Sequence, residues 1–190
     1  MLTGTSRELL TAVAGSGGAL TGLLFVAMSV APRSRTAGQP AVIREVRAAA
    51  SLLSFTNALA VSLFGLVPGD NAGYPALVMA VIGILFTAAG ARSILASPAT
   101  TRLDVRRQAG LIILLLAAFG VEFVAGVELI SSPASTGAAE LLGNVLVALL
   151  IIGVARAWEL VGDRDTGIIA SVAVLTGRDR DGERVTETAE

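Results

Sequence analysis

The chain has 190 residues, of which 54% are hydrophobic and 15% are charged, and its formal net charge is −1. The mean hydropathy of +0.76 is too high for a soluble domain and indicates an integral membrane protein. The charge balance excludes a strongly basic surface for nucleic acid, so we expect no nucleic-acid partner.

Five apolar stretches are long enough to cross the hydrocarbon of a bilayer as helices, which takes about 20 residues each. In chain order they are 9–31, 48–67, 75–91 with an extension to 95, 108–130 and 137–160. Helices satisfy their own backbone hydrogen bonds, which lipid cannot do for them. The predicted fold class is therefore an all-α polytopic membrane protein with five transmembrane helices.

The first span leaves two alternatives, a retained helix or a cleaved signal peptide. Its apolar run, 9–31, is longer than the core of a signal peptide, which has about 7–15 residues. The small residues Ser29 and Ala31 are followed by Pro32, which disfavours cleavage there. We expect a retained helix.

Arginine supplies every basic side chain of the chain, and 13 of the 14 arginines fall on one predicted side of the membrane. They are assigned to the loops after the first and third spans and to the C-terminal segment, which includes the end of the fifth span: Arg33, Arg35, Arg44, Arg47, Arg92, Arg102, Arg106, Arg107, Arg156, Arg164, Arg178, Arg180 and Arg184. Only Arg7 lies on the other side. Because basic residues in short loops stay cytoplasmic, we predict an N-terminus outside and a C-terminus inside.

The chain divides into a predicted five-helix membrane domain, 1–162, and a cytoplasmic tail, 163–190. Within the tail, 167–177 is apolar but too short to span a membrane. The last part, 178–190, is charged and poor in apolar residues, which predicts disorder.

The sequence contains no cysteine, histidine or lysine. Their absence excludes disulfides, thiolate nucleophiles, Cys/His metal sites, serine–histidine triads and lysine Schiff bases. No aspartate lies inside a predicted span, so an intramembrane aspartate pair is excluded too. We predict no enzyme activity, no catalytic residue, no cofactor and no metal site, with a metal held by carboxylates alone as the open alternative.

Glu122 is the carboxylate that the fourth span carries into the membrane. The uncharged stretch before it, 108–121, cannot cross alone, and Glu122 lies about 22 Å beyond Arg107 at 1.5 Å per residue. An ionised carboxylate at that depth costs about 2–3 kcal/mol unless it is paired or protonated. Ala118 and Gly126 lie four positions on either side, and this small-residue face predicts that Glu122 points into the bundle.

Two interpretations of Glu122 stay open. It is either a proton or cation ligand in a transport path, or a structural hydrogen-bond acceptor between helices or near the interface. Ser62 in the second span and Asn144 in the fifth lie at similar depth and are its candidate partners. The structural interpretation is favoured because Glu122 is not central in the membrane.

Asn57 lies close to mid-membrane in the second span, near a stripe formed by Ser51, Ser54 and Ser62. An unsatisfied amide is unfavourable in lipid, so Asn57 should bond to a neighbouring helix. Polar contacts between helices are favoured here over a lined pore.

Small residues recur every four positions in the first span, at Ala14, Gly18 and Gly22. This pattern lets two helices approach closely in lipid. We expect Gly18 and Gly22, with Gly126 of the fourth span, to be helix-packing positions, against a helix of the same chain or of another copy.

Four segments carry a resemblance to a known group: GALTGLLFVAMSV from Gly18, REVRA from Arg44, LVPG from Leu66 and RAWELVG from Arg156. They resemble an uncharacterised family of small bacterial integral-membrane proteins with about five transmembrane helices. The resemblance covers most of the membrane region and not the tail. It implies this architecture in a bacterial inner membrane, and it implies no activity or site residues.

The sequence predicts a non-enzymatic membrane component that acts through helix–helix partners within the lipid bilayer. Those partners are a second copy of the chain or other membrane proteins. The alternative is a small channel, or a proton- or cation-coupled transporter, that uses Glu122.

Overall fold

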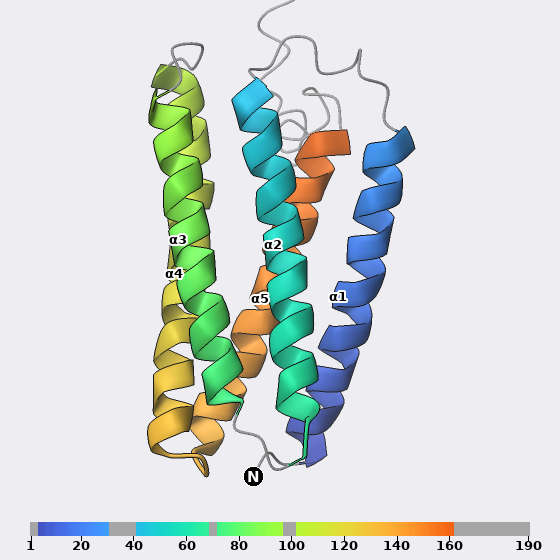
Figure 1. Cartoon of the computed structure of the whole chain (residues 1–190), viewed down its shortest axis with the longest axis vertical. Coiled ribbons are helices and arrows are strands. Elements are labelled where there is room, and N and C mark those ends of the chain that lie inside the picture. Colours follow the sequence, from blue (N-terminus) through green and yellow to red (C-terminus); the bar gives the residue numbers. More distant parts are fainter. Residues whose placement is uncertain (1–3, 31–40, 69–71, 97–101, 162–190) are drawn as a thin grey trace, which may run out of the picture.

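The computed structural model describes residues 4–30, 41–68, 72–96 and 102–161, and all regular elements in these ranges are α-helices. They are α1 (Gly4–Val30), α2 (Ala41–Leu66), α3 (Gly73–Ala96), α4 (Arg102–Ser131) and α5 (Thr136–Val161) (Figure 1). Each contains at least 22 residues apolar enough to cross a membrane. The predicted all-α fold with five spans is confirmed, and these helices indicate a multi-pass membrane protein.

The helices begin or end outside the predicted spans mainly where the arginines are. Helix α2 begins at Ala41 and α4 at Arg102, both about six residues before the predicted spans begin. The predicted bounds followed the uncharged residues. The helical hydrogen bonds of the backbone extend beyond them into the neighbouring charged residues. The helical turns next to the apolar runs therefore include charged residues such as Glu45.

The connection between α4 and α5 is held by side-chain hydrogen bonds. The Oγ atom of Ser135 accepts a bond from the backbone N–H of Ala138 at 3.2 Å, which caps the N-terminus of α5. The same hydroxyl donates to Oε1 of Glu128 on α4 at 2.8 Å. This cap fixes where α5 begins and ties it to the end of α4.

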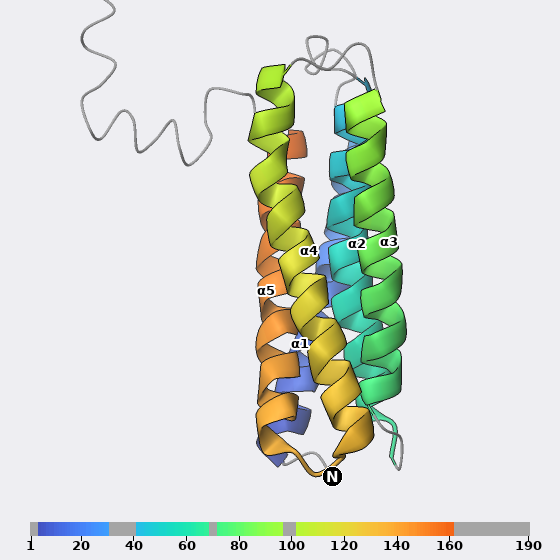
Figure 2. The same ribbon diagram turned by 90° about the vertical axis from the view of Figure 1, so that its left-hand side faces the viewer.

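Four of the helices form a ring in which α2 packs on α3, α3 on α4, α4 on α5 and α5 on α2. Helix α1 lies outside this ring and packs on α2 and α5 (Figures 1 and 2). In the ring, α2 and α4 therefore face each other across the bundle core. This diagonal is where the candidate site lies.

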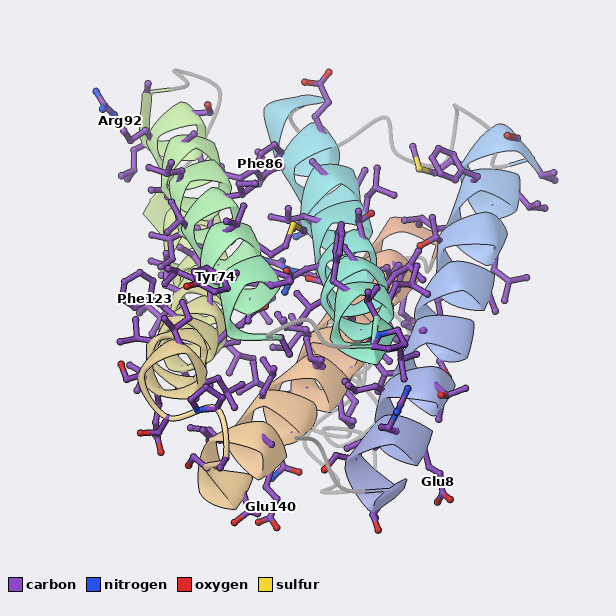
Figure 3. All side chains as sticks on the ribbon, turned by 60° about the horizontal axis from the view of Figure 1, so that its bottom comes forward. Glu8, Tyr74, Phe86, Arg92, Phe123 and Glu140 are labelled. Atoms are coloured by element: carbon purple, nitrogen blue, oxygen red, sulfur yellow. The ribbon has the colours of Figure 1, made fainter. Side chains whose placement is uncertain are left out.

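Helices α1, α3 and α5 finish at one end of the bundle, and α2 and α4 begin there (Figure 1). The helix ends that flank the arginine-rich segments therefore lie at one end of the bundle. Exposed Arg92 lies near that end, whereas Glu8 and Glu140 lie near the other (Figure 3). The orientation relative to a cytoplasm stays a prediction, and the predicted tail 163–190 lies outside the described residues.

The outer surface of the bundle is apolar along the helices. Tyr74, Phe86 and Phe123, which are labelled in Figure 3, are each more than a third exposed. A soluble protein would cover such residues, whereas lipid solvates them. The surface of the structure is thus consistent with the spans.

Two apolar clusters fill the interior. One includes Ala125 and Leu129 of α4, and the other includes Leu115 and Phe119 of the same helix. Along α4, Glu122 lies between the residues of the two clusters. A buried polar side chain therefore separates two apolar parts of the core.

Two glycines bring α3 and α4 into backbone contact. A Cβ atom on Gly126 would lie 2.9 Å from the backbone nitrogen of Leu77, and one on Gly73 would lie 2.7 Å from the carbonyl oxygen of Gly126. Backbone atoms cannot move aside as a flexible side chain can. Gly126 is thus a helix-packing position within the chain.

In α1 the packing glycine is Gly17, whose Cβ would lie 3.3 Å from the carbonyl oxygen of Phe55 on α2. Gly18 and Gly22 are exposed. A Cβ on Gly22 would meet nothing within 4 Å, and one on Gly18 would meet only Cδ1 of Leu59, at 4.0 Å. Gly18 and Gly22 therefore make little or no close contact within this chain, because residue spacing defines a stripe but not the direction it faces, and packing against another copy stays a prediction.

Candidate functional site

Glu122 of α4 is completely buried, with 0% of its side chain exposed. The prediction that it points into the bundle is confirmed. Asn57 of α2 is equally buried, and its Nδ2 atom donates a hydrogen bond to Oε2 of Glu122 at 2.7 Å. The prediction that Asn57 bonds to a neighbouring helix is also confirmed.

The bond joins the two helices that face each other across the ring. The long side chain of Glu122 allows α4 to reach Asn57 even though α2 packs mainly on α1, α3 and α5. Along α4, residues of the two apolar clusters flank Glu122 on either side. We call Asn57 and Glu122 the polar pair.

The polar pair leaves two of its oxygen atoms without hydrogen bonds. These are Oε1 of Glu122 and Oδ1 of Asn57, and both are buried. Buried polar atoms in native proteins nearly always have a partner. Because two orphaned acceptors occur in one pair, we take the polar pair as the candidate functional site.

The two predicted partners of Glu122 do not meet it. Ser62 is buried, but its Oγ atom has no hydrogen-bond partner, and Asn144 is exposed on the surface of α5. The prediction compared depths in the membrane, and depth does not determine which way a helical side chain points. Asn57 satisfies both conditions, because it is buried and within reach of Glu122.

The serine stripe of α2 contributes little between helices. Ser51 donates to the carbonyl oxygen of Arg47 at 3.0 Å, and Ser54 donates to that of Ala50 at 2.9 Å. Both hydroxyls thus bond one turn back in their own helix, a common solution for serine in apolar helices. Asn57, next to these serines, is the residue that bonds to another helix.

Arg156 is a buried residue that the sequence analysis missed. It was assigned to the cytoplasmic C-terminal segment, but it belongs to α5 and is 1% exposed. Leu142, Leu149 and Arg156 are spaced by seven residues, so all three share the buried face of α5. This spacing was the available signal, and a charge count along the chain could not reveal it.

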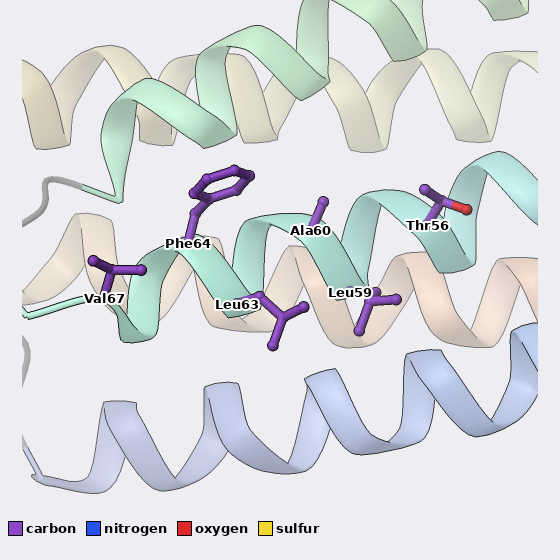
Figure 4. A pocket seen from close by; sticks show the side chains of 6 residues that line it. All are labelled: Thr56, Leu59, Ala60, Leu63, Phe64 and Val67. Carbon is purple, nitrogen blue, oxygen red and sulfur yellow. The ribbon is translucent and has the colours of Figure 1, made fainter.

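An apolar groove runs along the exposed face of α2, between α1 and α3 (Figure 4). Its volume is about 330 Å³, and it is lined by Thr56, Leu59, Ala60, Leu63, Phe64 and Val67. These residues repeat every three or four positions and so form one face of the helix. The groove is open to the surroundings of the bundle and is separate from the polar pair.

Within the described ranges, no group of three or more His, Cys, Asp or Glu side chains is placed to hold a metal ion. Comparison of the chain with protein families, with curated proteins and with solved structures gives no match. The candidate sites therefore rest on the geometry described above.

Proposed function

We propose that the protein is a non-enzymatic membrane component that acts by pairing its first helix with that of a second copy in the bilayer. The observation that supports this is the uncovered glycine face of α1. Gly15, Gly18 and Gly22 are all exposed, and added Cβ atoms would find open space at Gly15 and Gly22. In lipid, such a face lets another helix pack closely through van der Waals contact.

The apolar groove extends the same surface. Leu59, which lines the groove, is the residue nearest to a Cβ placed on Gly18. The glycine face of α1 and the groove on α2 thus adjoin. A helix that packed on the glycine face would also cover part of the groove, which increases the area available for contact.

A second copy suits this face because a glycine stripe is complementary to itself. Two α1 helices crossing at Gly18 and Gly22 would place the same residues opposite each other, as a two-fold symmetric interface requires. The lack of cysteine, histidine and lysine in the sequence supports the non-enzymatic part of the proposal.

Single-cysteine variants test the pairing cleanly because the chain has no cysteine of its own. Gly18→Cys places a thiol on the glycine face, and Ser16→Cys places one on the far side of α1, about 160° away at 100° per residue. Oxidation in native membranes should give a disulfide dimer with Gly18→Cys and none with Ser16→Cys. Adding Gly22→Ile should remove the dimer.

Two results would contradict this proposal. Equal crosslinking at both positions would show random collision rather than a specific interface. A product with the mass of a different protein would replace the second copy as the partner.

A proton- or cation-coupled transporter or small channel is the second candidate function. It is favoured by one observation, the two orphaned oxygens of the polar pair, since ionisable groups inside a membrane often mark ion paths. Flux of protons and sodium into liposomes, compared between the wild-type protein and Glu122→Gln, tests it. Unchanged flux would remove Glu122 from any transport mechanism.

We also propose residence in a bacterial inner membrane with the N-terminus outside. This rests on the family resemblance and on the arginines, whose segments are flanked by helix ends at one end of the bundle. Exposed Ser132 and Ser93 lie near opposite ends. In intact cells a membrane-impermeant maleimide should label Ser132→Cys and not Ser93→Cys, and the reverse pattern would invert the orientation.

A further inference from the structure

The polar pair contains two hydrogen-bonding groups of matching shape. A carboxyl group and a primary amide are both planar, and each presents two polar atoms side by side. One side of the pair is joined, because Nδ2 of Asn57 donates to Oε2 of Glu122 at 2.7 Å. The other side consists of Oε1 and Oδ1, both buried and both without a partner.

These two remaining atoms cannot satisfy each other if the carboxyl group is ionised. Both would then be acceptors only, and neither would have a donor. One proton on Oε1 changes this, because the hydroxyl it creates can donate to Oδ1. A single proton therefore satisfies both orphaned atoms and closes a ring of two hydrogen bonds between α2 and α4.

The surroundings supply little opposite charge for an ionised Glu122. Asn57 is neutral, and along α4 residues of the two apolar clusters flank Glu122 on either side. Helices α3 and α5 pack on both α2 and α4, and the buried polar side chains they contribute among the described residues are Thr87 and Arg156. Thr87 carries no charge, and Arg156 donates no hydrogen bond to Oε1 of Glu122.

We propose that the polar pair is a proton-binding site. Glu122 holds a proton on Oε1, and the resulting hydroxyl donates a hydrogen bond to Oδ1 of Asn57. The proton acts as the ligand that completes the contact between α2 and α4. This inference is independent of both proposed functions, since a bound proton requires neither a second copy nor transport. It specifies the ligand of the site: a proton rather than a metal cation.

The number of oxygen atoms supports a proton over a divalent cation. Calcium takes about six to eight oxygen ligands and magnesium about six in an octahedron. The pair offers two oxygens without partners, and Ser62 does not meet Glu122. A proton needs only one donor atom and one acceptor atom.

Infrared spectroscopy of the purified full chain in lipid vesicles tests the proton directly. A protonated carboxyl group has a carbonyl stretch that an ionised carboxylate lacks. The spectrum of the wild-type protein minus that of Glu122→Gln at neutral pH should show this band. Asn57→Leu should shift it, because the carboxyl group would lose its hydrogen-bond partner.

Thermal unfolding of the same variants gives a second, independent readout. The amide of Glu122→Gln can donate to Oδ1 and accept from Nδ2, so it reproduces the bonds of a protonated glutamate. We expect its melting temperature to match the wild-type value in sodium-free buffer. Glu122→Ala should melt lower, because it leaves both polar atoms of Asn57 without partners.

Two outcomes would overturn the proposal. One is a carboxylate band that disappears in Glu122→Gln with no protonated band in the wild-type protein. The other is a melting temperature that rises with sodium in the wild-type protein and not in Glu122→Gln, which would identify a metal cation as the ligand. Neither outcome would bear on the pairing of α1.

Discussion

The glycines of the α3–α4 contact and the exposed glycines of α1 are the same residue type in different surroundings. Gly73 and Gly126 touch the backbone of a neighbouring helix, whereas Gly22 meets nothing within 4 Å. The first pair is committed to the fold of this chain. Gly22 is left open on the outer surface of the bundle, where another helix can pack against it.

This difference teaches that a small residue in a membrane helix has two separate meanings. It allows close packing within the bundle, or it provides a site where another helix can approach. The two meanings predict different responses to the same mutation. Substitution at a buried glycine should change the free energy of unfolding, and substitution at an exposed one should change association alone.

Gly126→Leu should lower the free energy of unfolding more than any of the other variants. Its side chain would begin 2.9 Å from the backbone nitrogen of Leu77, so α3 and α4 must separate. Overpacking usually costs about 1–3 kcal/mol, and with backbone as the obstacle we expect more than about 3 kcal/mol. Denaturant unfolding in detergent micelles measures the free energy of unfolding.

Gly120→Leu is the matched control on the same helix. An added Cβ there would meet nothing within 4 Å, so we expect no loss in the free energy of unfolding and at most a gain of about 1 kcal/mol from the higher helix propensity of leucine. Equal losses in the two variants would show that the α3–α4 contact is not the cause.

Glu122→Ala should cause the next largest loss in the free energy of unfolding. It tests a buried polar contact, whereas the glycine variants test steric packing. Removing the carboxyl group leaves Nδ2 and Oδ1 of Asn57 buried without partners. Such a loss costs about 1–3 kcal/mol. The double variant Glu122→Ala with Asn57→Ala should recover part of the loss, and a strictly additive result would argue against coupling between the two residues.

Gly17→Val should have a smaller effect. Its Cβ would lie 3.3 Å from the carbonyl oxygen of Phe55 and 3.3 Å from Cβ of Leu59. Because α1 lies outside the ring, it can shift slightly, and we expect a loss of about 1 kcal/mol. A loss as large as that of Gly126→Leu would show that α1 is held as firmly as the ring helices.

Gly22→Ala should have the smallest effect on stability. The new methyl group would meet no atom of the chain, and alanine favours helix over glycine by up to about 1 kcal/mol. Stability should be unchanged or slightly higher, while dimer formation decreases. A clear loss of stability in the monomer would mean that this face is covered within the chain.

The helices could be predicted from the sequence because lipid imposes a length and a polarity that hydropathy reads directly. The inward direction of Glu122 could also be predicted, from the small residues one turn away on either side. Its partner could not. Ser62, Asn144 and Asn57 differ in the direction they face, and that direction depends on how each helix is rotated in the bundle.

Arg156 shows the same limit for a charged residue. As one of 14 arginines, it fitted the pattern of a cytoplasmic segment, and it lies on the buried face of α5 instead. The rotation of α5 places it there, because Leu149, seven residues before it, lies on the same face. Charge counting describes which side of a membrane a segment occupies, and it does not describe which side of a helix a residue occupies.

The order of the polar pair along the chain has a consequence for biogenesis. Asn57 precedes Glu122 by 65 positions, so the amide enters the bilayer first. At synthesis rates of about 5–20 residues per second, it waits about 3–13 s for the carboxyl group. The carboxyl group therefore inserts when its hydrogen-bond partner is already in the membrane.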